Sequence, residues 1–162
     1  MNYKYIILFS VIMSAVGLSC EKEDSYCNAG QFYFMAFGHF YGKCGGEGCV
    51  EIYKIENEKL YEETRDQYPG DEFYKFEEFV QLSNEKYDQV KDLPSDFPNE
   101  LWDESETILG IPDGGDWGGV YVEISSSRGH RYFLLDQNEN NMASVYNTFV
   151  DKINEKITII NQ

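Results

Sequence analysis

Residues 31–41 constrain the fold more than any other segment, because both alternating sets of their side chains are apolar. One set is Phe32, Phe34, Ala36, Gly38 and Phe40, and the other is Tyr33, Met35, Phe37, His39 and Tyr41. Alternation with a period of two predicts a β-strand. Such a strand belongs either at the centre of a sheet that is covered on both faces, or in a sheet with one aromatic face used for binding.

Several other segments carry strand and hairpin signals. The predicted strands are residues 50–55, 59–63, 120–124 and 131–135. A glycine-rich turn at 45–48 precedes the first of these, the turn signal Asn57-Glu58 precedes the second, and residues 126–129 link the last two. Turns this short join neighbouring antiparallel strands. The sequence therefore predicts a mainly antiparallel sheet.

Helices are predicted mainly in the second half of the chain. Ser83 is a suitable N-cap for a helix over 84–92, and Pro98 suits the start of a short helix through 99–103. A stripe of apolar residues at helical spacing then ends the chain: Met142, Val145, Tyr146, Phe149, Ile153, Ile157 and Ile160. This amphipathic helix is expected to pack on one face of the sheet.

Residues 72–80 fit two structures. Phe73, Phe76 and Phe79 recur every three residues, which suits a short helix after an Asp71 cap or an irregular strand. With either outcome, the expected fold is α+β: an antiparallel sheet of about four to six strands with the C-terminal helix on one face. We assign residues 31–162 to a single domain of this kind.

The first 19 residues have the composition of a secretory signal peptide. Lys4 is their only charged side chain, and an apolar run follows it to Leu18. This run is shorter than the roughly 20 residues that a membrane-spanning helix needs. An uncleaved anchor helix or a buried first helix are the alternatives.

The end of this segment, Val16-Gly17-Leu18-Ser19-Cys20, resembles the lipobox of bacterial lipoproteins. The resemblance implies that Cys20 is lipidated and becomes the first residue of the mature chain. The family prefers leucine three positions before the cysteine, where this chain has Gly17.

The acidic residues Glu21, Glu23 and Asp24 follow this cysteine within a polar segment, 20–30, that we interpret as a tether. They resemble the export tag of Bacteroidota lipoproteins and imply an outer-membrane location, lipid-anchored at the cell surface; the periplasmic face is the alternative. Palmitate labelling would follow from this assignment.

Three further cysteines remain after Cys20. Cys44-Gly-Gly-Glu-Gly-Cys49 places two of them across a short turn, where strand neighbours can bring their Cβ atoms close enough for a disulfide. We therefore predict a Cys44–Cys49 disulfide, as an exported protein allows, with Cys27 left unpaired. Pairing of Cys27 with one of these two cysteines is an alternative. A zinc site formed by these two cysteines with Cys27 and His39 is the alternative.

Charge excludes several classes of partner. Without the predicted signal peptide the chain keeps 12 basic and 29 acidic residues, a net charge of −17. Such a charge repels nucleic acid and anionic membrane surfaces. The thirteen Tyr and eleven Phe residues suit strands, and exposed tyrosines favour binding surfaces.

No catalytic motif stands out in the sequence. His39 is expected to be a packed strand residue and His130 a solvated loop residue, and no Gly-x-Ser-x-Gly nucleophile motif occurs. The most distinctive internal motif contains Asp113, Asp116 and Trp117 in a glycine-rich loop. These residues are candidates for ligand binding; calcium is a conceivable ligand of the two carboxylates, and a tight turn explains the same residues. We assign no metal and no cofactor.

The order of elements after the signal resembles that of small Bacteroidota lipoproteins, which implies a location and a fold more than an activity. We therefore expect a non-enzymatic, surface-tethered binding or inhibitory module, held to the membrane through its lipid and recognising a protein or a glycan. A periplasm-facing accessory lipoprotein in envelope structure or assembly is the second hypothesis. A hydrolase acting through carboxylates is the third.

Overall fold

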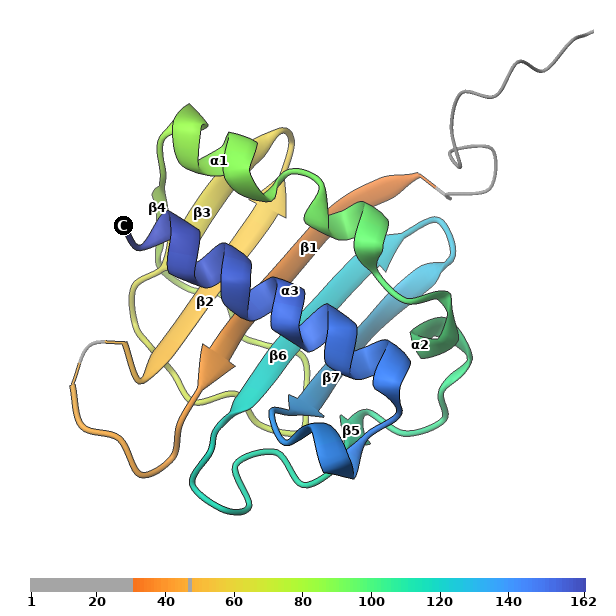
Figure 1. Ribbon diagram of the computed structural model, residues 1–162. Coiled ribbons are helices and arrows are strands. Elements are labelled where there is room, and N and C mark those ends of the chain that lie inside the picture. The colour runs from red at the N-terminus through yellow and green to blue at the C-terminus, as the bar shows by residue number, and fades with distance from the viewer. Residues whose placement is uncertain (1–30, 47) are drawn as a thin grey trace, which may run out of the picture.

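The fold is built on one seven-stranded sheet, seen in a computed structural model that describes residues 31–46 and 48–162 (Figure 1). The strands are β1 Phe32–Phe40, β2 Val50–Glu56, β3 Lys59–Glu63, β4 Phe79–Gln81, β5 Ile108–Leu109, β6 Gly119–Ser126 and β7 Gly129–Asp136. Their order is β4-β3-β2-β1-β6-β7-β5, and only the β5–β7 pair is parallel. The α+β prediction is confirmed, with more strands than expected because β4 and β5 extend the two edges. The predicted signal peptide, Cys20 and tether lie outside the described residues.

Strand β1 lies at the centre of the sheet, between β2 and β6. Met35 and Phe37 on one face, and Ala36 and Phe40 on the other, are at most 1% exposed. Of the two predicted arrangements for this segment, the covered central strand is therefore the correct one. Each face of the sheet has its own apolar cluster.

Helices cover one face of the sheet (Figure 1). They are α1 Asn84–Val90, the 3₁₀ turn η2 Leu93–Asp96, α2 Asn99–Asp103 and α3 Ser144–Ile160; a further 3₁₀ turn, η3 Glu139–Asn141, precedes α3. The predicted cap of α1 is present, since the Ser83 hydroxyl accepts a hydrogen bond from the Lys86 amide at 3.4 Å. Helix α3 buries the predicted stripe from Tyr146 to Ile160, while Val145 is exposed.

The opposite face is covered by residues 64–78, here named the strap, which passes behind the sheet in Figure 1. Its segment 72–78 is neither helix nor strand, and only Phe79 begins the edge strand β4. The regularly spaced phenylalanines instead pack onto the sheet: the ring of Phe76 lies 6.5 Å from that of Phe34, and the ring of Phe73 lies 4.9 Å from that of Tyr132. The predicted short helix is therefore absent, and the predicted strand forms only from Phe79 onward.

Candidate functional site

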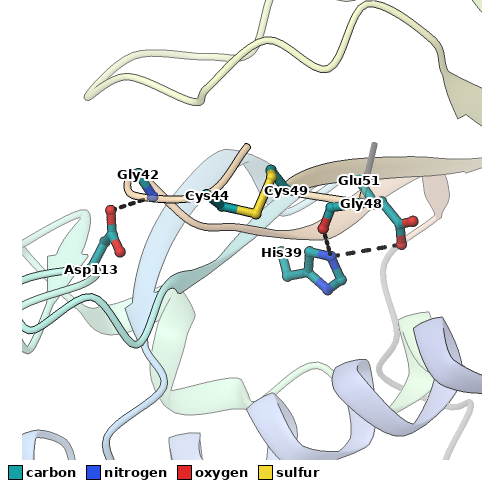
Figure 2. Close-up of a disulfide and its surroundings, with 7 residues drawn as sticks. All are labelled: His39, Gly42, Cys44, Gly48, Cys49, Glu51 and Asp113. Atoms are coloured by element: carbon teal, nitrogen blue, oxygen red, sulfur yellow. Dashed lines mark hydrogen bonds and ion pairs between the residues drawn. A yellow bond between two sulfur atoms is a disulfide. The ribbon is translucent and has the colours of Figure 1, made fainter. Parts of the chain in front are cut away.

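The predicted disulfide joins Cys44 to Cys49 in the loop between β1 and β2 (Figure 2). Their Cα atoms lie 5.5 Å apart. Oxidised sulfurs cannot act as zinc thiolates, so the alternative zinc site is wrong for this structure. Beside the disulfide, Nε2 of His39 lies 3.1 Å from the carbonyl oxygen of Gly48 and 3.7 Å from a carboxylate oxygen of Glu51. His39 therefore fixes the loop to the sheet, as a packed strand residue would.

Asp113, one of the three candidate binding residues, connects three parts of the chain. Its carboxylate accepts hydrogen bonds from the Gly42 amide at 2.7 Å, the Tyr68 hydroxyl at 3.0 Å and the Gly118 amide at 3.1 Å. Figure 2 shows the first of these contacts, next to the disulfide. Partial burial, together with the hydrogen bond and the charge of Asp113, raises the pKa of Tyr68 to about 12. Asp113 thus joins its own loop to the disulfide loop and to the strap.

Asp116 and Trp117 lie in the same loop but have different partners. Asp116 pairs with the exposed Lys43 at 3.1 Å. Trp117 keeps 38% of its surface exposed, and its indole nitrogen donates to Asp136 at 2.6 Å. Within residues 31–46 and 48–162, no group of three or more His, Cys, Asp or Glu side chains is placed to hold a metal ion. Ligand binding by this loop stays a prediction.

Asp136, at the end of β7, is a buried junction that the sequence analysis missed. It is fully buried and accepts four hydrogen bonds of 2.6–2.8 Å, from the Ile111 and Asn138 amides, the Trp117 indole and the Asn141 side-chain amide. Burial alone would raise the pKa of this carboxyl group, but the four donors outweigh it and lower the pKa below its usual value. The carboxylate of Asp136 therefore holds residues 111–117 in place.

His130 begins a polar network on the strap side of the sheet. Its Nε2 lies 2.7 Å from a carboxylate oxygen of Glu123, which is only 2% exposed, and its ring centroid lies 4.2 Å from that of Phe73. His130 belongs to strand β7 and not to a loop, which corrects that part of the prediction, while its side chain stays 43% exposed. The hydroxyl of Tyr121 donates to the other oxygen of Glu123. Burial, then the charge of Glu123, raises the pKa of Tyr121, which keeps this hydroxyl a donor.

The same network ties the strap to the sheet. The Tyr74 amide donates to the Tyr121 hydroxyl at 3.0 Å, and the Tyr74 hydroxyl lies 3.2 Å from a carboxylate oxygen of the buried Glu63. Burial and then the charge of Glu63 raise the pKa of Tyr74, so this hydroxyl also stays protonated. A glutamate–histidine pair can position an imidazole for proton transfer. Here, Glu123 contacts Tyr121 and His130 contacts Phe73. These contacts explain the pair as an anchor of the strap.

A cavity of about 700 Å³ lies on the helical side, at the end of the sheet where β1 and β7 begin. We name it the aromatic groove. Its lining includes buried Ile55, Phe97 and Ile124, half-buried Tyr87 and Trp102, and exposed Phe32 and Tyr33. Polar residues complete it: Gln31, Asn57, Glu58, Lys91, Ser95, Asn99, Ser126 and Arg128, with Pro94. Its volume falls within the range of sites that bind small ligands, and its lining is more polar than is usual for them.

The aromatic wall of the groove is fixed before any ligand arrives. The Arg128 guanidinium lies 4.9 Å from the ring centre of Trp102 and donates to the side-chain oxygen of Asn99 at 2.7 Å. The ring of Phe97 meets that of Trp102 edge-on at 5.3 Å. Arg131 on β7 also donates to the Trp102 carbonyl oxygen at 3.3 Å. Because these groups hold α2 and its tryptophan in place, little conformational entropy would be lost there when a ligand binds.

This groove could not be located from the sequence. Its residues come from the start of β1, the β2–β3 turn, α1, η2, α2 and the β6–β7 turn, so that no local motif contains them. The only signal was the surplus of tyrosine and phenylalanine, which favours binding surfaces without saying which residues meet.

The comparisons with known proteins leave the function to be argued from this geometry. No family model matches the sequence, and the comparison with curated proteins finds no match. Among the described residues, no helix has the length and apolar character needed to span a membrane.

Proposed function

We propose that this chain is a lipid-anchored binding protein that holds its ligand in the aromatic groove. The observation that carries the proposal is the concentration of exposed or half-buried aromatic rings and polar side chains in one preformed cavity of about 700 Å³. Tyrosine, tryptophan and arginine are the residues that contribute most to binding at protein surfaces. Tyr33, Tyr87, Trp102 and Arg128 provide all three types within this cavity.

The anchor is proposed from the sequence. The segment ending at Cys20 resembles a lipobox, and the acidic residues after it resemble a surface-export tag. Gln31 lines the groove and lies eleven residues after Cys20. At about 3.3–3.6 Å per residue these can span at most roughly 40 Å. A lipid on Cys20 would therefore keep the groove close to the membrane.

Two measurements test the anchor and its orientation. Radioactive palmitate is expected to label the wild-type protein and not the variant Cys20→Ala, because the thiol is the site of acylation. Protease treatment of intact cells is expected to digest the protein, since we place it on the outer surface. Labelling that persists in Cys20→Ala contradicts the lipid anchor, and resistance of the protein until the outer membrane is opened favours the periplasmic face instead.

A third measurement tests the groove as the binding site. Tyr33 is 48% exposed, so Tyr33→Ala removes a ring from the groove and leaves the core intact. Immobilised protein is exposed to an extract of envelope and extracellular material, and Tyr33→Ala is expected to retain at least tenfold less material than wild type. Ile111→Ala is the control, since Ile111 is 62% exposed in a loop at the other end of the sheet. Equal retention by wild type and Tyr33→Ala would contradict the proposal.

A further inference from the structure

We infer that the aromatic groove recognises a neutral oligosaccharide and that the carboxylate of Glu58 is one of its contacts. This inference rests on the proposed function, because it names the class of ligand for the same groove. Three independent features support it: the balance of charge in the groove, the chemistry of its lining, and the backbone conformation of Glu58.

Charge in the groove is balanced. Among the residues that the structure describes, the groove is lined by one carboxylate, Glu58, and two cations, Lys91 and Arg128. Lys91 is already paired with Asp88 at 2.9 Å, whereas Glu58 and Arg128 form no ion pair with other residues in the described part of the chain. An anionic ligand would meet Glu58 and a cationic ligand would meet Arg128, so an uncharged ligand matches best. This local balance contrasts with the net charge of −16 for the whole chain.

The chemistry of the lining matches a sugar. A hydroxyl group both donates and accepts hydrogen bonds; the carboxylate of Glu58 accepts, the guanidinium of Arg128 donates, and amide side chains do both. The rings of Tyr33, Tyr87 and Trp102 offer flat apolar surfaces beside these polar groups. A sugar ring presents the same combination, with hydroxyl groups at its rim and C–H groups on its faces. A cavity of about 700 Å³ also suits a short oligosaccharide better than a protein surface, which needs roughly 800 Å² of contact on each partner.

The backbone at Glu58 provides the third observation. Asn57 and Glu58 are the two central residues of the β2–β3 turn, between the paired residues Glu56 and Lys59, and their φ angles are +51° and +58°. Turns of this kind favour Asn-Gly, because glycine has no Cβ to oppose a positive φ. Glutamate in the second position therefore makes the turn less stable than glycine would. Backbone outliers of this kind concentrate at binding sites, and this residue lines the groove.

Calorimetric titration of the full chain in detergent tests the inference. The probes are maltohexaose, cellohexaose, mannohexaose and, as an acidic counterpart, hexagalacturonate. We expect at least one neutral hexasaccharide to bind and hexagalacturonate to bind more weakly. Glu58→Gly is expected to weaken that binding at least tenfold and, because the turn is relieved, to raise Tm by about 2–4 °C. Glu58→Gln retains an acceptor oxygen and the turn conformation, so it should lose less affinity and show no rise in Tm.

Asp66→Gly is the matched control. Asp66 is another non-glycine residue with positive φ, at +49°, but it lies in the strap and not in the groove. Its replacement is expected to leave the Kd for the hexasaccharide unchanged. The inference is overturned if no neutral hexasaccharide binds, if hexagalacturonate binds most tightly, or if Glu58→Gly binds as tightly as wild type.

One further treatment separates this inference from the proposed function. Periodate cleaves the vicinal diols of sugars, so it should abolish the Tyr33-dependent retention of extract material, whereas prior protease digestion of the extract should not. If protease abolishes retention and periodate does not, the groove binds a protein and only the oligosaccharide inference is overturned. If no extract material is retained through Tyr33 and no hexasaccharide binds, the proposed function and this inference are both wrong.

Discussion

Replacing Asp136 should destabilise the fold more than replacing any exposed carboxylate of the same region. Each oxygen of this buried side chain accepts two hydrogen bonds: Oδ1 from the Trp117 indole and the Asn138 amide, and Oδ2 from the Ile111 amide and the Asn141 side chain. Asp136→Ala leaves all four donors without this acceptor. Asp136→Asn keeps one acceptor oxygen. Its side-chain nitrogen is a donor and faces two of the four donors, which lose their acceptor.

The geometry sets the size of the effect. A buried donor that loses its partner costs about 1–3 kcal/mol, and such costs add incompletely when the groups are neighbours. We therefore expect a loss in the free energy of unfolding of about 2–3 kcal/mol for Asp136→Asn and about 3–5 kcal/mol for Asp136→Ala. Against a total of roughly 5–15 kcal/mol for a domain, the alanine variant would be close to unfolding.

The pKa of Asp136 gives the prediction a pH dependence. Because the pKa is lower in the folded chain than in the unfolded one, its contribution to stability is fully present above the unfolded value of about 3.9. It is lost as the pH falls through the folded value. The stability difference between wild type and Asp136→Asn should therefore be constant near neutral pH and shrink below about pH 4.

Urea unfolding, followed by far-UV circular dichroism, measures these differences. Asp116→Asn is the control, since its ion pair with Lys43 is exposed on both sides and should contribute less than about 1 kcal/mol. An Asp136→Ala variant within about 0.5 kcal/mol of wild type would refute the reasoning, because surface substitutions away from such features already vary by that amount. A difference that persists unchanged to pH 2 would refute the electrostatic part alone.

Two other features give predictions. Replacing both Cys44 and Cys49 by serine opens a loop of six residues, and chain entropy predicts that the free energy of unfolding falls by about 2 kcal/mol. Under reducing conditions, urea unfolding of the variant should match that of wild type. A difference that survives reduction would mean that the serines disturb the loop. His130→Ala takes the imidazole from the buried Glu123 and should cost about 1–3 kcal/mol. Hydrogen exchange should then quicken at Tyr74, whose amide donates to Tyr121, and unchanged exchange there would contradict the network as the anchor of the strap.

Elements whose apolar residues recur at a regular spacing along the chain could be predicted from the sequence. The period-two pattern of residues 31–41 predicted a strand, with a central covered position as one of two alternatives, and the apolar stripe ending at Ile160 predicted a helix on one face. The disulfide was also predictable, because Cys44 and Cys49 are five residues apart across a turn. In each case the interacting side chains are set by local geometry.

Features that depend on contacts between distant segments could not be predicted. The phenylalanines of the strap have a spacing that suits a helix, yet Phe73 packs on His130, more than fifty residues away in the chain. Strand β5 has two residues and pairs in parallel with β7, which leaves no periodic signal. The role of His130 could not be predicted for the same reason. It lies two residues after a turn, and its contact with the strap is made by a residue far away in the chain.

The positions of the groove and the Asp136 junction make the two sets of predictions separable. Strand β7 runs from the groove, beside Arg128, to Asp136, and its eight residues span about 25 Å. Asp113, Asp116 and Trp117 belong to the far end, where Asp113 and Trp117 hold the loop together. Effects at sites this far apart should add. Asp136→Asn, measured well below its own Tm, should therefore bind a neutral hexasaccharide as tightly as wild type does. A binding defect in that folded variant would indicate that the ligand binds at the loop and not in the groove.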